Sequence, residues 1–166
     1  ELREQARRLL APRSAPLRDT LLARIEANGE DALEALWVLH LRGEIEEAGL
    51  RSQLHHPNPH LRRWAVRLLG DRNQVNGVTL TELTALARRE SDVEVRSQLA
   101  SSARRLPAGQ AITIVRALLT HEQDATDLHL PLLLWWALEA KADSGREELL
   151  ALVRDPASWR SPILRD

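Results

Sequence analysis

Short helical segments, each ended by proline, glycine or a polar turn, follow one another along the whole chain. The clearest segment spaces its apolar residues at i, i+3, i+4, i+7 and i+8: Leu61, Trp64, Ala65, Leu68 and Leu69. This spacing places them on one face of a helix. No segment shows sustained alternation of apolar and polar residues, so the pattern predicts an all-α protein without strands.

The positions of these prolines, glycines and polar turns predict about ten helices joined by short turns. Asn28-Gly29, Gly43 and Pro156 are typical stop signals, because glycine suits the end of a helix and proline cannot continue one. The expected helical segments are residues 1–10, 17–27, 30–42, 44–54, 60–69, 79–89, 93–106, 107–119, 128–141 and 144–154.

The chain has 166 residues, 43% of them apolar, and a net charge of −1, which favours one folded domain or a short repeat array. The longest apolar run, residues 130–138, is too short to cross a bilayer and contains Pro131, so we expect no membrane insertion. The absence of cysteine excludes disulfides and thiolate metal sites. Residues 1–10 have neither an initiator Met nor a signal layout, so we expect a single repeat domain, 1–166, excerpted from a longer chain.

Helix-opening residues recur at a regular interval. Leu61-Arg62, Val95-Arg96 and Leu130-Pro131 open every second helix, 34 and 35 residues apart. The segments 57–70 and 91–100 resemble HEAT repeats of the PBS-lyase HEAT-like type, whose second helix opens with Asp-Pro-x-Val-Arg. The resemblance implies a right-handed α-α superhelix, a HEAT-like solenoid of four to five helix pairs.

A narrower likeness involves residues 127–139 and 32–43. Both resemble the helical region of large exported proteins of planctomycete-type bacteria, which are similar to membrane-bound dehydrogenases. Those proteins join a sugar-dehydrogenase-like β-propeller, a helical region and a c-type cytochrome domain. Over residues 32–165 the likeness implies the helical middle of such a protein, with haem chemistry elsewhere. It implies a periplasmic or exported location; without it we expect a cytoplasmic one.

The composition favours a binding module over an enzyme. The chain has no G-x-S-x-G nucleophile motif and no glycine-rich phosphate loop. Carboxylate pairs such as Glu46-Glu47 and Glu147-Glu148 are expected on solvated helix faces. A solenoid exposes an extended face made of its second helices. We therefore expect a non-catalytic scaffold without cofactors, a protein-interaction platform or interdomain spacer whose partners are proteins or neighbouring domains of the same polypeptide.

Charge distribution supports an alternative function. Residues 57–120 hold ten arginines and five acidic residues, a net charge of +5, whereas 30–56 and 121–166 each carry −4. A basic face could follow a phosphate backbone, as in HEAT-like DNA glycosylases, so a nucleic-acid-binding protein of that type is the alternative. The interleaved acidic residues instead favour local ion pairs, and matching positions of Arg62 and Arg96 favour a ladder between repeats. Our candidate interaction residues are Arg62, Arg63, Arg67, Arg96, Trp136 and Trp159.

The tryptophans divide into core and surface candidates. Trp37 and Trp64 lie on apolar helical stripes and are expected in the core. Trp135 and Trp136 are about 100° apart on a helix, so one should be core and the other should meet the next helix or a partner. Trp159 is expected to be exposed and to pack against a downstream segment.

Histidines form one cluster and one dipeptide. His55, His56 and His60 surround a proline turn that contains no carboxylate, so we expect solvated turn residues and no metal site. His121-Glu122 resembles the dipeptides of a HEAT-like di-iron hydroxylase family. That family needs several such pairs, and this chain has one.

Overall fold

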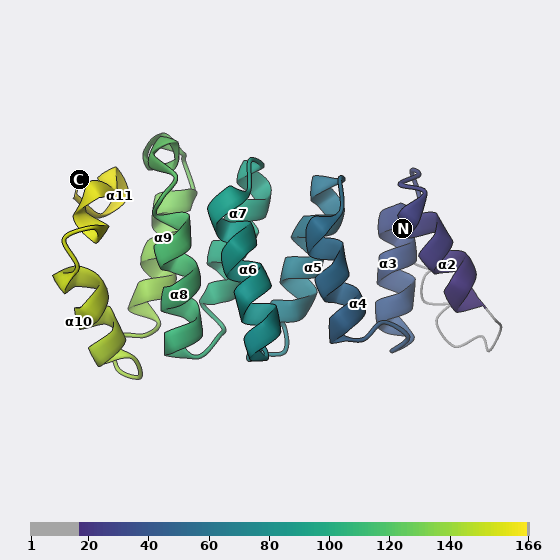
Figure 1. Ribbon diagram of the computed structural model, residues 1–166, viewed down its shortest axis with the longest axis horizontal. Coiled ribbons are helices and arrows are strands. Elements are labelled where there is room, and N and C mark those ends of the chain that lie inside the picture. The colour runs from purple at the N-terminus through teal and green to yellow at the C-terminus, as the bar shows by residue number, and fades with distance from the viewer. Residues whose placement is uncertain (1–16, 166) are drawn as a thin grey trace.

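The computed structural model describes residues 17–165, and in this range it contains helices and no strand. The helices stand side by side along the long axis, from α2 (purple) to α11 (yellow) (Figure 1). The α-helices are α2 (Leu17–Glu26), α3 (Ala32–Leu41), α4 (Glu47–Ser52), α5 (Pro59–Gly70), α6 (Gly77–Arg89), α7 (Val93–Ala103), α8 (Ala108–Leu118), α9 (Leu130–Glu139), α10 (Arg146–Arg154) and α11 (Pro162–Arg165). Three short 3-10 helices are η1 (Gln53–His55), η2 (Glu122–Thr126) and η3 (Ser158–Arg160). The all-α prediction is confirmed, and the helix expected at 1–10 lies outside the described residues.

Helices that are two apart in the chain pack on each other. One layer contains α4, α6, α8 and α10, and the other contains α3, α5, α7 and α9. The outer surface of α3, α5, α7 and α9 is called here the second-helix face. Apolar side chains fill the space between the layers, among them the fully buried Leu61, Leu99, Ile114 and Leu134. Each helix pair therefore buries its apolar side mainly against its neighbours.

A capping side chain recurs where the second helices begin. The side chains of Asn58, Asp92 and Asp127 accept hydrogen bonds of 2.8–3.1 Å from backbone N–H groups two or three residues further on. These bonds satisfy N–H groups that have no partner within the helix. The three positions are 34 and 35 residues apart. The sequence repeat is therefore a repeat of helix starts.

Two arginines, the buried Arg96 and the partly buried Arg62, connect consecutive helix pairs and form the ladder expected from the sequence. Arg62 donates two hydrogen bonds to the Glu90 carboxylate, at 2.8 and 2.7 Å, and Arg96 donates two to Asp124, at 2.7 and 2.5 Å. Each arginine also donates to a backbone carbonyl of its own turn, such as that of Glu90 at 3.0 Å from Arg96. Such bidentate, charge-assisted pairs fix both distance and orientation. The ladder therefore sets the register between one pair and the next.

The ladder has no equivalent third pair at α9. Pro131 stands where the first two second helices carry their ladder arginine, and Ser158 stands 34 residues after Asp124. The Ser158 hydroxyl is buried and finds no hydrogen-bond partner among the described residues. An ion pair between Arg116 of α8 and Asp155, which follows α10, holds the last pair instead.

Breaking one ladder pair should destabilise the protein strongly. The Arg96 and Asp124 side chains are only 4% and 3% exposed. Arg96→Met leaves a buried carboxylate without its partner, and we expect a loss of about 3–5 kcal/mol in the free energy of unfolding, measured by urea denaturation. The double variant Arg96→Met/Asp124→Leu removes both charges and should recover most of this loss. Equal losses in the single and double variants would contradict the assignment.

Candidate interaction surface

The second-helix face carries a groove of about 340 Å³ above α7. Helix α7 forms its floor, α5 forms one wall and α9 the other. Two of the α7 residues that line it, Ser97 and Ser101, have small side chains. The lining residues are Arg63, Trp64 and Arg67 from α5, Glu94, Ser97, Gln98 and Ser101 from α7, and Leu133 from α9. We call this feature the α7 groove.

The sequence of α7 explains why its outer surface is polar and small. Val95, Leu99 and Ala103 point into the core, which leaves Ser97 and Ser101 on the opposite side of the helix. Near its C-terminal end, α7 approaches the C-terminal end of α5 closely. A methyl group added at Gly70 would lie 2.7 Å from the Cβ atom of Ser102. The missing side chain at Gly70 therefore lets the ends of α5 and α7 come close together.

The α5 wall carries an aromatic ring and a cation, and this ring contacts a second tryptophan from α3. Trp37 and Trp64 meet edge to face, with ring centroids 4.7 Å apart and an interplanar angle of 78°. The Arg67 guanidinium lies 5.2 Å from the centroid of the Trp64 ring, a distance at which a cation is attracted to the ring face. The two tryptophans are half-buried, so the prediction that both lie in the core is correct only in part: Trp64 packs against the core without being fully buried. Trp64 sits at the edge of the core and lines the groove.

The α9 wall is apolar and extends beyond the groove lining. Leu133 lines the groove, and Trp136 lies about 60° further round the helix on the same side. Trp136 is 41% exposed and Trp135 is 61% exposed, so the prediction that one of them is core is wrong. Leu130, Leu134 and Ala137 occupy the inward positions of α9. Both tryptophans are therefore left for the outer surface.

Most arginines of the basic stretch lie beside carboxylates. Outside the ladder, Arg63 pairs with Glu94 at 3.3 Å, and Arg105 pairs with Asp71 at 3.1 Å. Arg67 is exposed and, within residues 17–165, contacts the Trp64 ring and no carboxylate. Ion pairs therefore interrupt the positive charge along the helices.

Two predicted surface residues belong to the ladder. Arg96 is 4% exposed, so its assignment to an interaction surface is corrected: it lies in the interior. The Arg62 side chain is 15% exposed, and its guanidinium is engaged by Glu90. Arg63 and Arg67 line the α7 groove, and Trp136 lies outside its lining, on the same side of α9 as Leu133. Sequence reasoning missed Ser97, Ser101 and Leu133, whose shared face becomes visible only when three helices are side by side.

Two histidine side chains in turns form hydrogen bonds with backbone carbonyls of the preceding helix pair. His56 Nδ1 accepts from the Asn58 N–H at 3.0 Å, so its Nε2 carries the proton that is donated to the Ile25 carbonyl at 3.1 Å. His121 Nε2 makes the equivalent contact with the Ala87 carbonyl at 2.8 Å. The prediction of a solvated His56 is therefore wrong, because its ring is half-buried between two turns.

The other histidines lie outside the interior. His55 sits between Glu82, at 3.0 Å from its Nε2, and Arg89, at 2.8 Å from its Nδ1. His60 is exposed. The described part of the chain contains no group of three or more side chains that could hold a metal ion.

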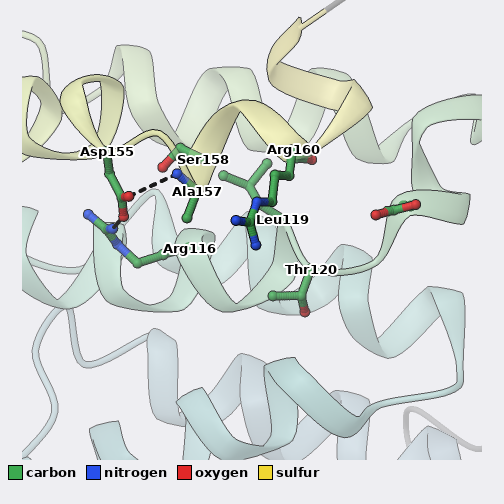
Figure 2. Close-up of a pocket in the computed structure, with 9 residues that line it drawn as sticks. Arg116, Leu119, Thr120, Asp155, Ala157, Ser158 and Arg160 are labelled. Carbon is green, nitrogen blue, oxygen red and sulfur yellow. Dashed lines mark hydrogen bonds and ion pairs between the residues drawn. The ribbon is translucent and has the colours of Figure 1, made fainter.

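A second hollow, also of about 340 Å³, lies between α8 and the segment after α10 (Figure 2). Arg116 points toward Asp155, and Arg160 reaches from the opposite side over Leu119. Glu122 also lines it, so two arginines and two carboxylate side chains border the hollow, and their formal charges balance.

Trp159 lies near this hollow on the outer surface. It is 46% exposed, and its indole N–H donates to the Val153 carbonyl at 2.7 Å. The exposure predicted for this residue is confirmed. Its expected packing against a downstream segment stays a prediction.

Comparisons with known proteins give no match: no protein-family model, no curated protein and no solved structure matches the chain. Between residues 17 and 165, none of the helices has the length and apolar character needed to cross a membrane.

The ladder should make stability depend on acid pH through Glu90. Burial alone would raise the pKa of Glu90, but hydrogen bonds from Arg62 and from the Asp92 N–H outweigh it and hold the pKa below its ordinary value. Such a carboxylate adds stability above its unfolded pKa of about 4.3 and loses it as pH falls through the lower folded value. We expect Glu90→Gln to reduce the loss of unfolding free energy below about pH 4.3, measured by urea denaturation.

The variant Arg62→Met supplies the control. It leaves Glu90 buried without its partner, so protonation in acid now relieves a buried charge. Its stability should fall less steeply with acid than that of the unchanged protein. If the unfolding free energy of the unchanged protein, Glu90→Gln and Arg62→Met falls in parallel as the pH is lowered, this pH dependence does not come from the Arg62–Glu90 pair.

Proposed function

We propose that the chain is a HEAT-like, right-handed α-solenoid that serves as a non-catalytic protein-interaction platform. The recurrence of caps and ladder arginines at 34 to 35 residues supports the repeat assignment, together with packing between helices that are two apart. The observation that carries the proposed function is the α7 groove, in which three second helices combine a polar floor with an aromatic and an apolar wall. Concave grooves of this kind accept a peptide segment.

The larger context of the platform is a second part of this proposal. The likeness of residues 127–139 and 32–43 to exported, dehydrogenase-like proteins supports a role as interdomain spacer in a redox polypeptide. The chain has no cysteine for covalent haem attachment, so in that context it would supply positioning alone. A C-x-x-C-H motif downstream and propeller strands upstream in the parent reading frame would support this context, and their absence would refute it.

A nucleic-acid-binding role has less support from the observed contacts. Binding to a phosphate backbone requires arginines that are available along one face. Arg62 and Arg96 are already paired with carboxylates in the ladder, and Arg63 is paired with Glu94. Filter binding to DNA across a salt series tests this alternative, because phosphate contacts produce a steep salt dependence.

Site-specific photo-crosslinking tests the platform. A benzoyl-phenylalanine at Ser97 stands in the α7 groove, whereas the same group at the exposed Thr113 stands on α8 in the other layer. In cells that produce the protein, we expect discrete crosslinked protein adducts from position 97 and few from position 113. Equal adduct yields at both positions, or none at position 97, would refute a platform that uses the second-helix face.

A further inference from the structure

The two walls of the α7 groove differ in chemistry. Arg67 and Arg63 lie on the α5 wall, and Leu133 lies on the α9 wall, continued by the exposed Trp136. Arg67 has no carboxylate partner among the described residues, and Arg63 contacts Glu94 in an exposed pair at 3.3 Å. Exposed pairs of this kind exchange partners at little cost. The groove therefore offers positive charge along one edge and apolar surface along the other.

The dimensions of the groove suit a single chain segment. Packed helices lie about 8–10 Å apart, so α5 and α9, which flank α7, are separated by roughly twice that distance. Each wall helix with its side chains has a half-width of about 5–6 Å, which leaves roughly 4–10 Å between the walls, less than the width of a further α-helix. One extended segment, which needs about 5 Å, therefore fits between the walls above Ser97 and Ser101.

We propose that the α7 groove binds a peptide segment of a partner protein that carries acidic side chains on one edge and aliphatic or aromatic side chains on the other. The inference deepens the proposed function and rests on it. A carboxylate of the partner accepts a bidentate hydrogen bond from Arg67 while the Trp64 ring supports the guanidinium from below. Apolar side chains of the same segment pack on Leu133 and Trp136, which reduces their exposure to water.

Charge complementarity favours an acidic peptide over a nucleic-acid strand. A strand of nucleic acid presents phosphates at regular intervals and needs cations along its whole path. The groove offers a cationic wall on one side only, so it cannot follow such a path. A peptide can place one or two carboxylates against Arg67 and Arg63 and leave the rest of the groove to apolar contacts.

Peptide display on the whole chain tests this inference. A phage library of random dodecapeptides is panned on the protein, and selected peptides are measured by fluorescence anisotropy. We expect selected sequences enriched in Asp and Glu together with Leu, Ile, Phe or Trp. Arg67→Glu should weaken binding about tenfold or more, as expected for a lost charge-assisted hydrogen bond. Ser101→Trp, which fills the groove without touching the core, should abolish it.

Arg88→Glu supplies the matched control. Arg88 is exposed on α6 and does not line the groove, so this variant should bind the selected peptides as the unchanged protein does. Circular dichroism checks that each variant is folded.

The outcomes separate this inference from the proposed function. One outcome would overturn the acidic-partner inference and leave the platform in place. In it, the selected peptides lose binding with Ser101→Trp, but they show no enrichment in acidic residues and bind Arg67→Glu as tightly as the unchanged protein. Failure to select any peptide that Ser101→Trp weakens, combined with no crosslinked adduct at position 97, would overturn both. Tighter binding of a fluorescent oligo(dT) 20-mer than of any selected peptide would also overturn the inference.

Discussion

Buried arginine–carboxylate pairs set the spacing on which the rest of the structure depends. Each pair connects the start of one second helix to the turn that follows the first helix of the next pair, 28 residues along the chain. A buried charge is costly unless its partner meets it in good geometry, so the two elements must adopt one relative position. Apolar packing alone is non-directional and would tolerate small slides between neighbouring helices. The ladder removes that freedom between α5, α7 and α9, the three helices that form the α7 groove.

The fold separates the residues that hold the stack from those available to a partner. Leucines, alanines and valines fill the space between the two layers, and the arginines and histidines of the turns connect neighbouring pairs. The outward positions of the second helices contribute little to this packing. They can therefore carry side chains such as Trp136, Arg67 and Ser97, which the packing between the layers does not require. Exposed aromatic side chains grouped beside a groove indicate an interaction site more strongly than the same residues scattered singly.

The end of the ladder changes how the last helix pair is attached. Where Pro131 replaces an arginine and Ser158 replaces a carboxylate, the buried bidentate contact is lost from both sides together. The Arg116–Asp155 pair that takes its place is partly exposed, and such pairs contribute less than buried ones with full hydrogen bonding. The structure thus has its most firmly connected part at the centre, where the groove lies.

The sequence by itself determined the helices, the turns between them and the interval at which second helices begin, because these depend on local hydrogen bonds and on apolar spacing within one segment. It also indicated that Arg62 and Arg96 play matching roles, since both follow a capping residue by four positions. The tertiary structure decided which carboxylates they bind, since Glu90 and Asp124 lie 28 residues further on and meet them only after two pairs stack. It likewise decided that Trp64 lines a groove and that both Trp135 and Trp136 are exposed. Helical periodicity says which residues share a face; which neighbour covers that face, and how far, depends on the positions of whole helices.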